Sequence, residues 1–178
     1  MHALAFREGT SVDVEAVVAL VNAAYLGGSS RQGWTSVAAL FDGQRTDERA
    51  IAAAVDHADS SVLLLAEADG SLVGCCELQR NDSVAYFGTF AVDPTLQGGG
   101  IGRRLLTYAE TEAVRRWGST AMEMTVITQR RELIAWYERL GFTATGERRA
   151  FSYGEDDVSR PLRDDLEFVV LRRVTGNR

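Results

Sequence analysis

The stretch from Tyr86 to Trp117 constrains this chain more than any other: YFGTFAVDPTLQGGGIGRRLLTYAETEAVRRW. An apolar run typical of a strand ends at Asp93-Pro94, because proline has no N–H to give to a sheet. A loop with four glycines in residues 98–102 follows. Apolar residues then recur every four positions, which predicts an amphipathic helix. This order of strand, glycine loop and helix favours an anion-binding site, since unpaired first-turn N–H groups and the helix dipole face the loop.

Two arginines in the first turn of this helix support the same interpretation. Arg103 and Arg104 oppose the helix dipole, so they fit better if a bound anion compensates their charge. The glycines remove the Cβ atoms that would hold a diphosphate away from the backbone. We therefore expect a phosphate-containing ligand at the loop; the alternative is a flexible helix entry without one.

Two other phosphate-binding loops fit the sequence less well. Arginine at position 103 breaks the Gly-x-Gly-x-x-Gly spacing of dinucleotide-binding folds. The P-loop pattern Gly-x-x-x-x-Gly-Lys-Ser/Thr does not occur. An NAD-binding module is therefore a minor alternative.

Composition indicates a single globular domain over residues 1–178. The chain is 46% hydrophobic with only two prolines, and no apolar run approaches the ~20 residues that cross a bilayer. The N-terminus shows no signal-peptide pattern, so a cytoplasmic location is expected. A net charge of −6 argues against nucleic acid or an anionic membrane as partner, and weakly favours a cationic substrate.

The cysteines and histidines do not predict a metal site. Cys75 and Cys76 are adjacent, so on a strand they point to opposite faces, and a disulfide between them would be strained. We expect both to be buried thiols in a reducing compartment. The two histidines, His2 and His57, have no clustered partners, so zinc is not expected.

Periodicity and turn signals predict a mixed α/β fold in the order β-α-α-β-β-β-α-β-α-β-β, with helices on both sides of one sheet. The strands are expected at residues 4–7, 62–67, 72–78, 84–92, 122–126, 142–147 and 166–172. The helices are expected at residues 11–25, 46–57, 103–117 and 131–140. Segments 31–45 and 154–165 are expected to be loops, the first with a short helical turn.

Two motifs in this order resemble the GNAT N-acetyltransferase superfamily. The sequence from Val92 through Gln97-x-x-Gly100-x-Gly102 resembles its acyl-CoA loop, Gln/Arg-x-x-Gly-x-Gly/Ala. Beyond one helix and one strand, the segment from Tyr137 to Gly141-Phe142 resembles its second landmark, a helix ending Tyr-x-x-x-Gly-Phe. The resemblance covers roughly residues 4–172.

The resemblance implies a fold and an activity. The fold is a single central, largely antiparallel, splayed sheet of about six to seven strands flanked by about four helices, with the pantetheine arm of CoA in the opening. The activity is transfer of an acetyl group from acetyl-CoA directly to a primary amine of a small molecule or peptide, without a metal. A homodimer formed through the late strands is common in the family. The residues implied to hold acetyl-CoA are Phe90, Ala91, Val92, Gln97, Gly98, Gly99, Gly100, Ile101, Gly102 and Arg103.

A tyrosine and a carboxylate are the candidate catalytic residues. The resemblance places Tyr137 by the CoA sulfur, and a phenol with a pKa near ~10 stays protonated while a thiolate with a pKa near ~8.5 forms, so Tyr137 is the expected general acid. The alternative is a buried tyrosine that only packs. Glu77, on the strand beside residues 84–92, is the candidate base; an ordinary solvent-facing strand residue is an equal alternative.

The acceptor side is less defined. By resemblance, the acceptor pocket is walled by Tyr25, Trp34 and the loop 148–165, the latter with Phe151, Tyr153, Asp156 and Asp157; the aromatic residues are equally consistent with plain packing. Many members carry asparagine seven residues before the tyrosine, where it contacts the CoA arm, but here that position is Arg130. A CoA-binding sensor without turnover therefore stands as the main alternative to an enzyme.

Overall fold

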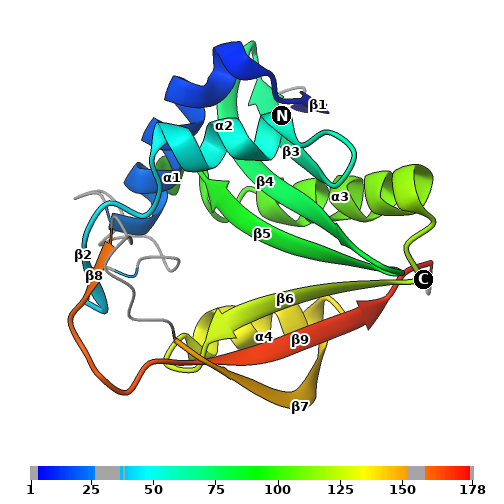
Figure 1. The fold of residues 1–178 in the computed structure, drawn as a ribbon. Coiled ribbons are helices and arrows are strands. Elements are labelled where there is room, and N and C mark those ends of the chain that lie inside the picture. The colour runs from blue at the N-terminus through cyan, green and yellow to red at the C-terminus, as the bar shows by residue number, and fades with distance from the viewer. Residues whose placement is uncertain (1–3, 27–36, 38, 152–158, 177–178) are drawn as a thin grey trace.

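A seven-stranded sheet forms the centre of the protein (Figure 1). The computed structural model describes residues 4–26, 37, 39–151 and 159–176. The strand order is β1-β3-β4-β5-β6-β9-β7, and every neighbouring pair is antiparallel except β5 and β6. The strands are β1 (Leu4–Glu8), β3 (Ser61–Ala68), β4 (Ser71–Asn81), β5 (Val84–Val92), β6 (Ala121–Ile127), β7 (Thr143–Ala150) and β9 (Glu167–Val174). The predicted mixed α/β fold with a largely antiparallel sheet is confirmed.

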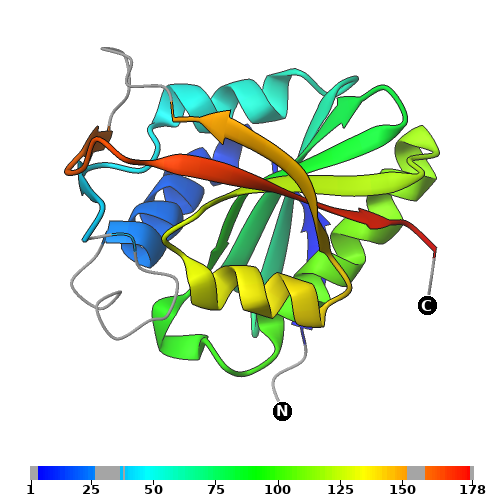
Figure 2. The same cartoon turned by 90° about the horizontal axis from the view of Figure 1, so that it is seen from below.

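Four α-helices in the described part of the chain cover the two faces of the sheet (Figure 2). One face carries α1 (Val14–Leu26) and α2 (Glu48–Asp56), and the other carries α3 (Ile101–Trp117) and α4 (Arg131–Arg139). Burial on both faces explains why β3 reads as a continuous apolar run and not as an alternating one. No helix of the described residues is long and apolar enough to cross a membrane.

Helix starts and turns follow local signals in the sequence. Thr10 and Asp13 form the capping box before α1, and the Asp47 side chain accepts from the N–H of Ala50 at the start of α2. Asp69 and Gly70 both have positive φ angles, of 50° and 79°, and connect β3 to β4 as the two-residue hairpin that the sequence predicts.

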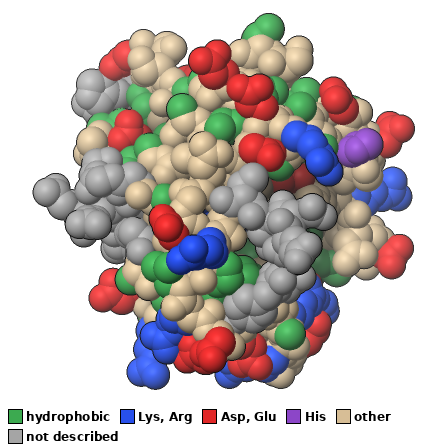
Figure 3. All heavy atoms as spheres, turned by 60° about the vertical axis from the view of Figure 1, so that its left-hand side comes forward, with side chains coloured by type: hydrophobic (Ala, Val, Ile, Leu, Met, Phe, Trp, Pro, Cys, Tyr) green, Lys and Arg blue, Asp and Glu red, His purple; other side chains and the backbone are tan. Residues whose placement is uncertain are grey.

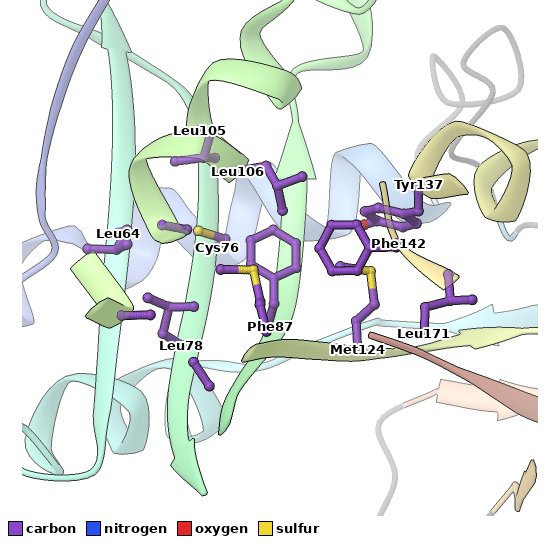
Figure 4. Packing of buried hydrophobic residues seen from close by; sticks show 14 of the residues in the cluster. Leu64, Cys76, Leu78, Phe87, Leu105, Leu106, Met124, Tyr137, Phe142 and Leu171 are labelled. Carbon is purple, nitrogen blue, oxygen red and sulfur yellow. The ribbon is translucent and has the colours of Figure 1, made fainter. Parts of the chain in front are cut away.

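The two cysteines lie on opposite faces of β4, as predicted. Cys75 packs in the cluster below α1 and α2, and Cys76 packs in the cluster below α3, near Leu105 and Leu106 (Figure 4). Both are free and fully buried. Burial raises the pKa of Cys75 to about 12, so this thiol is not a nucleophile at neutral pH.

The sheet opens between β5 and β6. These strands pair only where Val84–Tyr86 meets Ala121–Glu123, and they diverge beyond that point (Figure 1). The Tyr86 hydroxyl and Thr125 Oγ1 lie 2.7 Å apart at the start of the divergence. The splay that the resemblance implied is therefore present, and it leaves the C-terminal half of β5 open toward β6.

Two short strands lie in the segments that were predicted to be loops. β2 (Phe41–Gly43) pairs with β8 (Ser159–Pro161) in a separate antiparallel sheet, so the expectation of unbroken loops at 31–45 and 154–165 was wrong. A single helical turn does precede β2, because the carbonyl of Val37 accepts from the N–H groups of Leu40 and Phe41. Strands of three residues that pair across more than a hundred positions leave no periodic pattern in the sequence.

Candidate active site

The glycine loop joins the end of β5 to the start of α3. The Asp93 side chain turns the chain by accepting from the N–H of Thr95 at 2.8 Å. Gly98 and Gly100 then adopt φ angles of 89° and 79°, a left-handed conformation that favours glycine. Among the described residues no side chain caps the N-terminus of α3, and its first turn contains no acidic residue, so its first amides face the loop.

A cavity of about 330 Å³ lies between this loop, β5 and α4. Of the residues predicted to hold acetyl-CoA, all line this cavity except Ala91 and Gly99. Ala91 is buried on the opposite face, below α1, and the Gly99 N–H points back to the carbonyl of Leu96 at 3.4 Å. We call this space the glycine-loop cavity; its lining residues are Phe90, Val92, Leu96, Gln97, Gly98, Gly100, Ile101, Gly102, Arg103 and Trp136.

Two stacked aromatic rings form one wall of the glycine-loop cavity. The rings of Phe90 and Trp136 lie 6.0 Å apart at an angle of 15°. A Cβ at Gly102 would come within 3.1 Å of Phe90 and 3.8 Å of Trp136, so glycine at this position lets α3 approach these rings. The sequence analysis did not assign Trp136 to the CoA site; its place one residue before Tyr137 was the available signal.

A β-bulge shapes β5 beside the opening. Cys75 pairs with Ala91 and Glu77 pairs with Gly88, which leaves Thr89 and Phe90 outside the regular ladder. Thr89 has a φ of 46°, a strained value for a β-branched residue. The carbonyls of both residues accept from side chains: that of Phe90 from the Tyr25 hydroxyl at 2.8 Å, and that of Thr89 from Cys75 Sγ at 3.6 Å.

Tyr137 packs beside Phe90 from α4 and is not among the described lining residues of the glycine-loop cavity or of the second cavity described below. It is almost fully buried, and its ring lies 6.5 Å from Phe90 and 5.8 Å from Phe142, which is beside it in Figure 4. Burial raises the pKa of the Tyr137 phenol well above its ordinary value of 10, and the positive charge of Arg130 opposes this shift. The phenol is therefore protonated at neutral pH, as a proton donor must be.

Glu77 lies on the opposite face of the sheet from Tyr137. Its carboxylate accepts from Ser61 Oγ at 3.0 Å, from Gln79 Nε2 at 2.7 Å and from Thr89 Oγ1 at 3.0 Å. It lines neither the glycine-loop cavity nor the second cavity described below. The structure thus joins Glu77 to the bulge through Thr89, and its role as a base stays a prediction.

A second cavity, of about 310 Å³, opens on the side of α1, β2 and β8. Tyr25 and Phe151, two of the residues expected at the acceptor pocket, line it; Trp34, Tyr153, Asp156 and Asp157 lie outside the described residues. We call it the arginine cavity, after two residues that the sequence analysis did not place there. Its described lining residues are Tyr25, Val37, Phe41, Arg45, Val126, Ile127, Arg130, Phe151, Ser159 and Phe168.

Tyr25 links the arginine cavity to the opening in the sheet. Its ring lines the cavity, and its hydroxyl donates to the carbonyl of Phe90 at 2.8 Å. Phe90 also lines the glycine-loop cavity. The hydrogen bond between Tyr25 and Phe90 therefore connects the linings of the two cavities.

Comparison with known proteins decides between the families that the sequence left open. Residues 31–142 match the model of the acetyltransferase (GNAT) family. The chain belongs to this family. It is an acyltransferase of the N-acetyltransferase type, which favours the enzyme over the sensor and the NAD-binding module. None of the curated proteins compared matches the sequence.

Solved structures of GNAT acetyltransferases share the fold. The ribosomal-protein-S18-alanine N-acetyltransferase from Escherichia coli superposes with a TM-score of 0.70 at 19% identity, over 99% of this chain and 96% of that one. YncA from Salmonella typhimurium, a putative acetyltransferase solved with its cofactor acetyl-CoA, superposes with a TM-score of 0.67 at 20% identity. The match covers 99% of this chain and 96% of that one. The spermidine/spermine N-acetyltransferase SpeG from Vibrio cholerae superposes with a TM-score of 0.67 at 16% identity, over 97% of this chain and 92% of that one. At these identities the likeness shows the fold alone.

Proposed function

We propose that this GNAT protein transfers an acetyl group from acetyl-CoA directly to a primary amine of a small molecule. One observation carries the proposal: Tyr25, which lines the arginine cavity, is hydrogen-bonded to Phe90, which lines the glycine-loop cavity. The glycine-loop cavity suits the cofactor and the arginine cavity suits the acceptor. The acetyl group is then assigned to the side of Phe90.

The glycine-loop cavity has the features that CoA requires. The first-turn amides of α3 and the left-handed glycines offer N–H groups to the diphosphate, and Arg103 adds a positive charge at the rim. Phe90, Val92 and Trp136 give the cavity an apolar wall for the pantetheine arm. A neighbour in the same fold, YncA, was solved with acetyl-CoA, which supports this cofactor.

The proposed reaction is a single displacement. The neutral amine nitrogen attacks the thioester carbonyl carbon, and a backbone N–H group of β5 beside the opening is assigned to stabilise the oxyanion, an effect worth about 3 kcal/mol for a well-placed donor. The carbon–sulfur bond then breaks. Tyr137 gives its proton to the departing thiolate, because its pKa lies above that of a thiol.

The proton that the amine loses is assigned to Glu77 through water, because Glu77 lines neither cavity. Glu77 is hydrogen-bonded to Thr89 at the bulge, so its negative charge lies next to the strand that holds the acetyl group. A covalent acyl-enzyme is not part of the proposal, because both cysteines are buried and their pKa values are raised. A trapped acyl-cysteine would contradict direct transfer.

The test is release of CoA thiol from acetyl-CoA with a panel of amines, amino acids and peptides. The proposal predicts thiol release that depends on the amine, with the acetylated amine as second product. Binding of acetyl-CoA without thiol release for any amine would favour a sensor. Stabilisation by NAD and not by CoA would contradict the cofactor assignment.

A further inference from the structure

The groups that the proposed reaction uses belong to two halves of the sheet. The base Glu77 lies on β4 and the oxyanion donor is assigned to β5, whereas the acid Tyr137 lies on α4, which follows β6. The strands β5 and β6 pair only where Val84–Tyr86 meets Ala121–Glu123, so a short backbone ladder joins the two halves. The position of the acid relative to the base therefore depends on the contacts that span the opening.

One hydrogen bond between side chains spans the opening at its closed end. Tyr86 and Thr125 point to the face of α1 and α2, because their neighbours Phe87 and Met124 lie in the core cluster on the other face (Figure 4). The two hydroxyl oxygens lie 2.7 Å apart, and either group can donate. This bond ties β5 to β6 just beyond their last backbone pair, which joins Tyr86 to Glu123.

A glycine makes room for the Tyr86 ring. A Cβ at Gly88 would come within 3.1 Å of Tyr86 Cε1 and 3.7 Å of Cδ1, so the ring lies over this glycine. If the ladder continued by two residues, Gly88 would face Thr125; instead, the strands have parted there. The tyrosine thus bridges the gap where the splay removes the backbone pairing.

Both ends of this bridge are anchored in the sheet. Gln79 pairs with Tyr86 across the β4–β5 ladder, and its side chain donates to Glu77 at 2.7 Å. Glu123, two residues before Thr125 on β6, is buried in ion pairs with two arginines of β7 and β9. The bridge therefore connects the part of the sheet that holds the candidate base to the part that precedes the acid.

Apolar packing joins the two halves on the other face of the sheet. The Phe90 ring lies 6.0 Å from that of Trp136 and 6.5 Å from that of Tyr137. The open side of the splay comes forward in Figure 3, and hydrophobic side chains reach the surface there beside a basic one. Hydrophobic packing is non-directional, whereas a hydrogen bond weakens steeply away from its preferred distance and angle. The bridge thus adds a defined distance to a contact that packing alone leaves adjustable.

We propose that Tyr86 and Thr125 are positioning residues, whose hydrogen bond fixes the width of the splay at its closed end and so the distance from Tyr137 to the thioester on β5. The inference rests on the proposed function and adds two residues to its site. Burial is the largest cause of the raised pKa of Tyr137, and the charge of Tyr86 adds to it, so the two phenols lie within electrostatic range. A displacement of about 1 Å between reacting groups can lower a rate by about a hundredfold.

The test is a double-mutant cycle on the bridge, measured as thiol release from acetyl-CoA with the best amine of the panel. Tyr86→Phe and Thr125→Val should each lower kcat by about tenfold to a hundredfold and leave the KM for acetyl-CoA within about twofold. The double variant should be about as slow as either single variant, because both remove the same bond. Thr125→Ser keeps the hydroxyl and should restore most of the rate.

Two control variants remove a hydroxyl outside the opening. Tyr108→Phe changes a ring of α3 that stacks on Phe6, and Thr143→Val changes an exposed residue of β7; both should keep kcat. All rates are taken well below the Tm of each variant, so that a loss of stability is measured separately.

Three results would overturn the inference. The first is an unchanged kcat in Tyr86→Phe with a lowered Tm, which would make the bond a stabilising contact only. The second is a double variant whose loss is the product of the two single losses. The third is Thr125→Ser as slow as Thr125→Val, a comparison that also decides the case if Tyr86→Phe does not fold. If the wild type acetylates no amine, the proposed function fails and the inference fails with it.

Discussion

Replacing Gly100 by alanine separates the backbone role of the glycine loop from its role in binding. Gly100 has a φ of 79°, and a Cβ at this position would meet no atom within 4 Å. The cost is therefore backbone strain of about 1–2 kcal/mol. Alanine also lowers the conformational entropy of the unfolded chain, which stabilises the folded state by about 0.4–1 kcal/mol. A net loss of about 1 kcal/mol lowers the Tm of a chain of this size by about 2–4 °C.

Gly70→Ala is the matched control for Gly100→Ala. Gly70 has the same φ of 79° and the same open surroundings, but it lies in the hairpin between β3 and β4. The Tm should fall by a similar amount in both variants. Only Gly100→Ala should lose the rise in Tm that acetyl-CoA produces, because its methyl group obstructs the diphosphate.

The loss of acetyl-CoA affinity in Gly100→Ala can be estimated from the hydrogen bonds that the methyl group would prevent. Losing one charge-assisted N–H bond costs about 1.5–3 kcal/mol, which weakens binding by about tenfold to a hundredfold. Thermal unfolding with and without acetyl-CoA measures both effects in one experiment. If Gly100→Ala keeps the acetyl-CoA shift seen with Gly70→Ala, the diphosphate does not lie at this loop and the reasoning is refuted.

Three further predictions address the acid, the sheet and the N-terminal cap. Tyr137→Phe should lower kcat by about 10²–10⁴ with an unchanged KM for acetyl-CoA, whereas Tyr108→Phe should retain activity; a fully active Tyr137→Phe would exclude the acid role. Glu123 is buried between two arginines, so Glu123→Gln should lower the free energy of unfolding by about 1–3 kcal/mol, measured by urea unfolding. An unchanged urea midpoint would contradict this. The Arg7 guanidinium holds the pKa of Asp13 well below its ordinary 3.8, so Asp13 stabilises the fold above about pH 4 and this contribution fades on acidification. The Tm gap between wild type and Asp13→Asn should therefore narrow as the pH falls below about 4, and a gap that widens would reverse the argument.

Local signals in the sequence predicted most of the sheet and the conformation of the glycine loop. The hairpin at Asp69-Gly70 and the glycine loop depend on residues adjacent in sequence, so their conformation can be read from composition and spacing. The pairing of β2 with β8 could not be predicted in this way, because each strand is three residues long and its partner is distant.

The arginine cavity depends on contacts between distant segments. Arg45 follows β2 and Arg130 precedes α4, and only the fold brings both against Tyr25. In the sequence, Arg130 appeared as a departure at a position where the family contacts CoA; in the structure it lines the other cavity. The bulge at Thr89 was also missed, because its cause is a register shift against β4 and not a glycine.

Calorimetric titration of the full chain with CoA and, separately, with pantetheine tests the central claim most directly. Pantetheine lacks the diphosphate, so it can occupy the apolar wall but cannot use the amides of the glycine loop. The account predicts measurable heat with CoA, affinity that falls as salt rises, and binding of pantetheine weaker by at least about a hundredfold. Equal affinity for the two compounds, or no heat with CoA, would contradict it.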